Sequence, residues 1–275
     1  PDGYTLMLDA SNHAQNPALH PKMQFDTLTA FAPVSLLLRV PNVLVVTPSY
    51  EVKTVADLIR LGQPGGKEQV YFASAGPGSA QHLAGELFNL LAKTQLQHVA
   101  YKGGGPAMID VMSGQVPVMF ASMGSAWQHV KNGKLRAVAV GGAQRSKAAP
   151  DLPTIAESGV PGFEATVWYG IYGPKALPAR LLQRWSDSIN RYMKTPQAQA
   201  HWRRTDMIGG GGTSAYFTDY HKRETDRWYA VMKAAGIVPQ LYEETLENLQ
   251  AIGWAVTSAV LVAALWRSLR LSTGR

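Results

Sequence analysis

Small and polar residues cluster in a segment where an anion could bind. Residues 71–82 have the sequence YFASAGPGSAQH, an apolar run followed by a small-residue loop and then by Ser79, a good helix N-cap. Free N–H groups at a helix start lie at the positive end of the helix dipole, and glycine lets an anion approach the backbone. We therefore predict an anion-binding loop with the candidate ligand-binding residues Ser74, Ala75, Gly76, Gly78, Ser79 and Gln81.

Two further loops have related features. Residues 99–106, VAYKGGGP, place Pro106 where it suits a first helical turn, and Lys102 adds a positive charge. A polar loop at residues 11–16 follows the first apolar run, and open α/β sheets bind ligands at the carboxyl ends of their strands. One glycine-rich turn alone would favour a purely steric role, but three such loops favour binding. The added candidate residues are Tyr101, Lys102, Gly103 and Gly104, with Ser11, Asn12 and His13.

Other kinds of chemistry have little support. The loop at residues 76–79 lacks the Gly-Lys-Ser/Thr of a P-loop, and residues 103–105 lack a complete Gly-x-Gly-x-x-Gly. There is no Gly-x-Ser-x-Gly elbow, and neither Ser74 nor Ser79 has an evident base in the sequence. The seven histidines form no His-Glu-x-x-His motif, and the chain has no cysteine. We predict no catalytic residue, no metal, no cofactor and no enzyme activity.

Composition predicts a globular chain with an anionic partner. Its 275 residues suit one large domain or two ordinary ones, and 46% hydrophobic with 16% charged residues argues against disorder. The chain has 26 Lys and Arg against 19 Asp and Glu, a net charge of +7. The basic residues are scattered, with no run of five, so nucleic acid is not a predicted partner.

Apolar runs alternate with amphipathic segments, which predicts the α/β class with a mostly parallel sheet. The expected strands are residues 4–8, 34–38, 43–46, 70–73, 96–101, 116–120 and 135–140. The expected helices are residues 54–61, 79–93, 106–112, 125–131, 179–193, 197–207 and 216–235. Between these groups lies a Pro/Gly-rich stretch, residues 150–178, in which Trp168, Tyr169 and Tyr172 favour a packed core strand over a ligand platform.

Both ends of the chain are unusual. The chain begins at Pro1 and enters an apolar run almost at once, so we expect truncation or processing at this end. Residues 251–266, AIGWAVTSAVLVAALW, carry no charge and approach the ~17-residue lower limit of a membrane-spanning helix. Three interpretations stay open for Ala251 to Trp266: a membrane anchor with its basic flank in the cytoplasm, a buried helix, or sequence from a displaced reading frame.

Seven motifs in a fixed order carry a family resemblance. They are PDGYTL at 1–6, NPAL at 16–19, SAGPGSAQHLAGE at 74–86, YKGGGPA at 101–107, PTIAESG at 153–159, WYG at 168–170 and KAAGI at 233–237. Over about residues 1–238 the chain resembles Bug-type extracytoplasmic solute receptors, the binding components of tripartite tricarboxylate transporters. Residues 238–275 are an addition that this resemblance does not explain.

The resemblance implies a two-lobed periplasmic-binding-protein-like architecture with a cleft between the lobes. Lobe one would comprise residues 1–38 and 170–239, lobe two residues 39–169, and residues 240–275 a C-terminal apolar tail. A small carboxylate would be held by loop amides, with residues 74–81 as one pincer and residues 11–13 and 101–105 lining the same cleft. It would then be delivered unchanged from the periplasm to membrane permease subunits.

The same resemblance implies sequence upstream of Pro1. A signal peptide, a first strand and a Gly-Gly loop that supplies the second pincer would precede it, so we expect lobe one of the given chain to be partly unfolded. Two alternatives remain beside the receptor: a truncated remnant that binds nothing, and an enzyme on the same scaffold.

Overall fold

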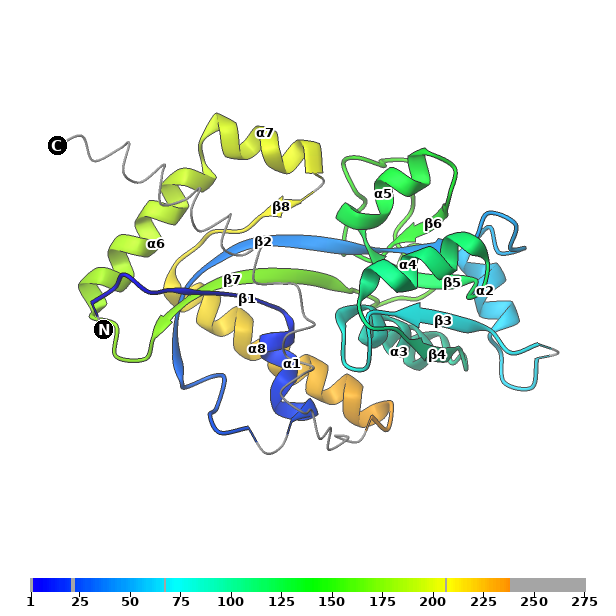
Figure 1. Cartoon of the computed structure of the whole chain (residues 1–275), viewed down its shortest axis with the longest axis horizontal. Coiled ribbons are helices and arrows are strands. Elements are labelled where there is room, and N and C mark those ends of the chain that lie inside the picture. The colour runs from blue at the N-terminus through cyan, green and yellow to red at the C-terminus, as the bar shows by residue number, and fades with distance from the viewer. Residues whose placement is uncertain (1, 21–22, 67, 206, 238–275) are drawn as a thin grey trace. The chain divides into compact units, whose positions relative to one another are not determined.

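The computed structural model describes residues 2–20, 23–66, 68–205 and 207–237 (Figure 1). Strands and helices alternate along most of it. In chain order the elements are β1 (Met7–Ala10), α1 (Asn12–Leu19), β2 (Phe31–Val46), α2 (Val55–Leu61), β3 (Tyr71–Ser74), α3 (Ala80–Ala92), β4 (Gln97–Ala100), α4 (Gly104–Ser113), β5 (Val118–Ser122), α5 (Met123–Lys131), β6 (Arg136–Val140), β7 (Thr166–Pro174), α6 (Ala179–Met193), α7 (Pro196–Thr205), β8 (Ile208–Gly209) and α8 (Ser214–Ala234).

The strands form one mixed sheet. Its order is β1-β7-β2-β5-β3-β4, and β6 and β8 also pair with β2. The predicted α/β class is confirmed, but the sheet is not mostly parallel as expected: β3 runs parallel to β4 and β5, and the other pairings between described strands are antiparallel. The parallel strands belong to the run β3-α3-β4-α4-β5, in which each helix returns the chain so that the next strand runs in the same direction.

The long strand β2 joins two groups of strands. Its first part pairs with β7 as far as Pro41, and its second part pairs with β5 from Asn42 onward. The sequence predicted two separate strands here, residues 34–38 and 43–46, on either side of Pro41. Pro41 instead lies where β2 changes partner.

The predicted lobe boundaries face each other across the pairing of β2 with β7, since Leu38 lies opposite Tyr169. The division into two lobes at these boundaries stays a prediction.

The aromatic residues of β7 were interpreted as part of a packed core strand, although no bounds were predicted for this strand. Trp168 and Tyr172 are fully buried, which confirms that interpretation for both. Gly170 lies between them, and a Cβ there would overlap the ring of Phe217 from α8. Glycine at this position therefore lets α8 pack directly on the strand.

The apolar segment Ala251 to Trp266 lies outside the described residues. Within the described ranges, none of the helices has both the length and the apolar character that a membrane span requires.

Helix α3 carries the most informative loop at its start. Ser79 caps it, with its Oγ accepting the His82 N–H at 3.3 Å. Leu83, Leu87 and Phe88 bury one face in the core. The helix ends at Ala92, and its C-cap is Lys93, whose φ of 56° is left-handed.

The C-cap of α3 gives a first prediction. A left-handed conformation costs a non-glycine residue about 1 kcal/mol, and the Lys93 side chain is exposed. We expect Lys93→Gly to raise the free energy of unfolding by about 0.5–1 kcal/mol. Urea denaturation followed by tryptophan fluorescence measures the change, and a lower free energy would contradict it.

Candidate functional site

Three helices begin at one edge of the sheet. Because β3 is parallel to β4 and to β5, the carboxyl ends of the three strands lie at the same edge. Helices α3, α4 and α5 follow these strands after short loops or directly. Open α/β sheets bind ligands at this kind of edge. None of the three helices has an acidic residue in its first turn, so the positive ends of their dipoles are not neutralised locally.

The structure brings two of the predicted loops together. Backbone N–H groups of the second loop donate to carbonyls of the first: Tyr101 to Ser74 and Gly103 to Ala75, both at 3.1 Å. A Cβ at Gly76 would lie 3.2 Å from the Tyr101 carbonyl, so glycine permits this close packing. The loops at residues 74–79 and 101–103 therefore form one surface.

Hydrogen-bond donors are available on this surface. The N–H groups of Ala80 and Gln81, in the first turn of α3, donate to no residue in the described part of the chain. In the second loop Gly103 has a φ of 106°, and a Cβ built at Gly103 or Gly104 would meet no atom within 4 Å. With the exposed Lys102 close by in sequence, the arrangement can accept an anion through backbone amides and one cation.

The hydroxyl of Tyr101 is already engaged. It donates to the Oδ2 atom of Asp110 in α4 at 2.8 Å. Partial burial, followed by this hydrogen bond, raises the pKa of Tyr101 to about 12. The side chain is therefore neutral near pH 7 and is directed to α4.

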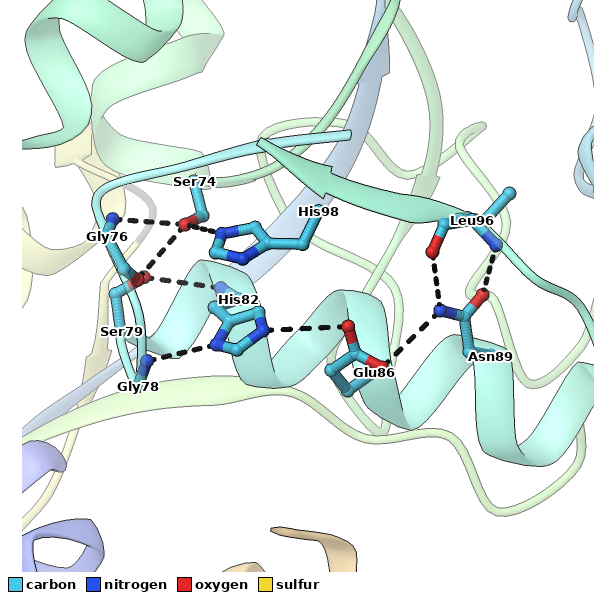
Figure 2. A network of polar contacts seen from close by, with 9 residues as sticks. All are labelled: Ser74, Gly76, Gly78, Ser79, His82, Glu86, Asn89, Leu96 and His98. Carbon is cyan, nitrogen blue, oxygen red and sulfur yellow. Dashed lines mark hydrogen bonds and ion pairs between the residues drawn. The ribbon is translucent and has the colours of Figure 1, made fainter. Parts of the chain in front are cut away.

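A histidine pair behind the first loop was missed by the sequence analysis (Figure 2). His82 Nδ1 accepts the Gly78 N–H at 3.0 Å, and His98 Nε2 lies 2.6 Å from the Ser74 hydroxyl. The two rings stack with centroids 3.8 Å apart. His98 was missed because it reaches Ser74 only through the parallel β3–β4 register, which pairs Phe72 with His98.

The Ser74–His98 contact resembles a nucleophile and its base, but Ser74 is not accessible. The residue is fully buried, and its Oγ also accepts the Gly76 N–H at 3.0 Å and lies 3.1 Å from the Gly76 carbonyl. The hydroxyl therefore fixes the shape of the loop.

Burial, followed by the charge of His82, lowers the pKa of His98 to about 4. A free histidine has a pKa of about 6.5, so the unfolded chain binds more protons between these two values. The contribution of His98 to stability is therefore complete above about pH 6.5 and is lost as the pH falls toward 4.

Polar contacts extend this network to the start of β4 (Figure 2). Glu86 Oε1 lies 3.5 Å from His82 Nε2, and Asn89 exchanges two hydrogen bonds with the backbone of Leu96. The Asn89 amide also donates to Glu86 Oε2 at 3.5 Å. Helix α3 is thus fixed both to its own loop and to the neighbouring strand.

Gly78 is required by the conformation of the loop. Its φ is 71°, and a Cβ would overlap Leu19 at the end of α1. The loop therefore packs tightly on α1. Any substitution at Gly78 would disturb this packing whether or not a ligand is present.

The third predicted loop, residues 11–16, is instead the start of a helix: Ser11 is the N-cap of α1 and residues 12–16 belong to it, so the prediction of a loop here is wrong. Ser11 precedes the helix, and Asn12 and His13 begin it, about 10 Å along the axis from Leu19. His13 is 3% exposed, its Nδ1 lies 2.8 Å from Asp9 Oδ2, and its ring packs on Tyr172. Within the described ranges, no hydrogen bond, ion pair or ring contact joins residues 11–13 to the two joined loops.

Residues 122–125, the end of β5 and the first residues of α5, lie at the same sheet edge and were not among the predicted sites. Ser122 is the N-cap of α5 and makes no side-chain capping bond, while Ser125 is exposed and donates to the Ser122 carbonyl at 2.9 Å. Its sequence, Ser-Met-Gly-Ser directly after a buried strand, is the signal that could have identified it.

Comparisons with known proteins identify the family of this chain. The model of the tripartite tricarboxylate transporter family receptor matches residues 1–237. Protein BugT of Bordetella pertussis (strain Tohama I) is 32% identical over 243 residues, covering 86% of this chain and 72% of BugT.

Two solved structures are also similar. A protein of R. palustris, solved with adipate, has 31% identity and a TM-score of 0.78, covering 86% of this chain and 79% of that one. MatC from Rhodopseudomonas palustris, with bound malate, has 25% identity and a TM-score of 0.72, covering 84% and 80%. The structure neighbours include the periplasmic binding protein BugD, which confirms the predicted periplasmic-binding-protein-like α/β architecture. This chain therefore belongs to the family of Bug-type receptors of tripartite tricarboxylate transporters.

Proposed function

We propose that this chain is a solute-binding receptor that captures a small organic carboxylate without changing it. The observation that carries the proposal is the convergence of three helix N-termini at one sheet edge, with no acidic residue in their first turns. Backbone amides at such a site favour an anion with several acceptor oxygens. Two proteins of similar structure were solved with the dicarboxylates adipate and malate.

The ligand would contact the two joined loops first. The N–H groups of Ala80 and Gln81 and the Lys102 side chain are the donors we assign to one carboxylate. Residues 74–81 and 101–104 would form this subsite, and residues 11–13 would line the cleft further along α1. The lobes at residues 1–38 with 170–239 and at residues 39–169 would close over the ligand, as in other hinged binding proteins.

Membership of the family indicates where the ligand would be captured and to which subunits it would be delivered. A receptor of a tripartite tricarboxylate transporter would act in the periplasm and deliver its ligand to the membrane permease subunits of that transporter. Enzyme activity on the same scaffold is disfavoured because Ser74, whose hydroxyl is paired with a histidine, is fully buried.

Isothermal titration tests the proposal. We expect at least one of succinate, malate, adipate and citrate to bind with a Kd of about 1–100 μM, corresponding to about −8 to −5 kcal/mol. Adipamide, which has the length of adipate without its charges, should bind at least about tenfold more weakly because it cannot offer an anion to the helix starts. Proton NMR of the recovered ligand should show it unchanged. Absence of binding across the panel, or conversion of any ligand, would overturn the proposal.

A further inference from the structure

Two histidines hold the candidate binding loop from behind. His82 lies in the first turn of α3 and His98 in β4, and their ring planes are inclined by only 19°. Figure 2 shows the rings directed to different points of the loop, one toward Gly78 and one toward Ser74. His82 is 7% exposed, so the Gly78 N–H has little access to water as a replacement partner.

The hydrogen bonds determine where the proton of His82 lies. Nδ1 accepts the Gly78 N–H, so Nδ1 carries no proton in this arrangement. The ring proton is then on Nε2, which lies 3.5 Å from Glu86 Oε1. A second proton on Nδ1 would direct two N–H donors at each other. The bond to Gly78 therefore requires a neutral His82 ring.

Few charged groups face the two rings. The neighbouring groups are Glu86 from α3, Phe72 and Ser74 from β3, and, at Gly78, Leu19 from α1. Helix α8 packs on α3, but none of its described residues bonds to either ring. Glu86 is thus the one carboxylate recorded beside the pair in the described part of the chain. Because the rings stack, a charge on one opposes a charge on the other.

We propose that His82 and His98 are positioning residues for the binding loop, and that protonation of His82 at Nδ1 releases the loop and weakens ligand binding. This proposal rests on the proposed function, because it assigns an acid response to the same site. The neutral rings hold Gly78 and Ser74, and these two residues set the backbone path that leads into the free amides of α3. Without the bond to His82, the Gly78 N–H loses its recorded acceptor. The backbone that leads from Gly78 into the first turn of α3 is then no longer held in place.

The loop can be examined without any ligand. We expect the Gly78 amide of the full chain, observed by ¹H–¹⁵N NMR, to be protected from exchange at pH 7.5 and to lose protection by pH 4.5. The measured exchange rate of the Gly78 amide is compared with the intrinsic amide exchange rate at the same pH. In His82→Leu the protection should already be absent at pH 7.5. In His82→Asn, whose Oδ1 can accept the same N–H, the protection of the Gly78 amide should persist from pH 7.5 to pH 4.5, whereas the wild type loses it.

Binding gives the second readout. Loss of one hydrogen bond of about 1 kcal/mol predicts that His82→Leu weakens carboxylate binding about fivefold to tenfold at pH 7.5. His82→Asn should recover most of that loss and should show a flatter dependence of Kd on pH than wild type. Acid also protonates the ligand, but this effect is common to all variants. The matched control is His129→Asn, in the last turn of α5 and so away from the loops, which should keep the wild-type profile.

The two readouts separate this proposal from the proposed function. If no carboxylate binds, the proposed function fails, and the Gly78 amide still decides whether His82 holds the loop. Equal pH profiles of Kd for wild type and His82→Asn, or a Gly78 amide that stays protected at pH 4.5 in the wild type, would overturn the proposal. A His82→Leu variant that protects Gly78 as the wild type does would also overturn it.

Discussion

Gly85→Ala is expected to lower the free energy of unfolding by about 3 kcal/mol, the upper end of the usual cost of overpacking a core. The Cβ of an alanine at this position would overlap the ring of Phe72 in β3. That ring is fully buried and meets Phe120 edge-on, with centroids 6.0 Å apart, so it cannot move aside without disturbing the core. Urea denaturation of the ligand-free chain, followed by tryptophan fluorescence, measures the loss.

The matched control is Gly105→Ala in α4. It is the same substitution in another helix, and no atom lies within 4 Å of the Cβ position. We expect it to stabilise the chain by about 0.5–1 kcal/mol, because alanine has the higher helix propensity. Equal effects of the two substitutions would show that α3 does not pack on β3 through Gly85.

The βα units between residues 70 and 131 could be predicted from the sequence because their signals are local. Ser79 caps α3 as expected, and β3 and β5 are short, mostly apolar runs that end at a serine. Helix α6 has the predicted bounds, residues 179–193, because its amphipathic pattern is strong. Such elements need no knowledge of distant parts of the chain.

The elements that were missed or left without bounds depend on distant contacts. Helix α1 has poor helix formers and contains Pro17, and it is supported by packing on α8, far away in sequence. Strand β7 was predicted as a core strand only from its aromatic residues and without bounds, because glycine weakens a strand pattern. Gly170 is nevertheless required there, since a Cβ would overlap the ring of Phe217. Local propensity alone cannot anticipate either case because tertiary packing overrides it.

The candidate site also has a part that could be predicted from the sequence and a part that depends on distant contacts. The loops at residues 74–81 and 101–104 were predicted from their glycines and caps, and their contact follows from the parallel pairing of β3 and β4. The partners of these loops could not be predicted. The Ser74–His98 and Gly78–Leu19 contacts depend on strand register and on the position of α1.

The loop at residues 74–79, which leads into the free amides of α3, therefore also holds several parts of the structure together. It contacts α1 through Gly78, β4 through Ser74 and the second loop through two backbone bonds. Substitutions at its glycines would change folding and binding together. A binding test needs a position where charge can be changed without altering the fold, and the first residue of α3 meets this requirement.

Ala80→Asp is expected to weaken carboxylate binding about 100-fold. Ala80 is the first residue of α3, and its N–H is one of the free donors assigned to the ligand. Two negative charges about 5 Å apart repel by about 3 kcal/mol at an effective dielectric constant of about 20, which corresponds to about 100-fold in Kd. An aspartate in the first turn also stabilises a helix, so the fold should not suffer. Isothermal titration with the best ligand of the panel measures the change.

Ala80→Asn is the matched control, because it has nearly the same size and hydrogen-bonding groups as aspartate without the charge. We expect it to weaken binding by less than about tenfold, since it removes no amide donor and adds no repulsion between charges. Urea denaturation should show that neither variant has a free energy of unfolding more than about 0.5 kcal/mol below that of the wild type. If asparagine and aspartate weaken binding equally, the loss comes from bulk and not from charge. If neither affects binding in chains that fold normally, the carboxylate does not bind at the start of α3.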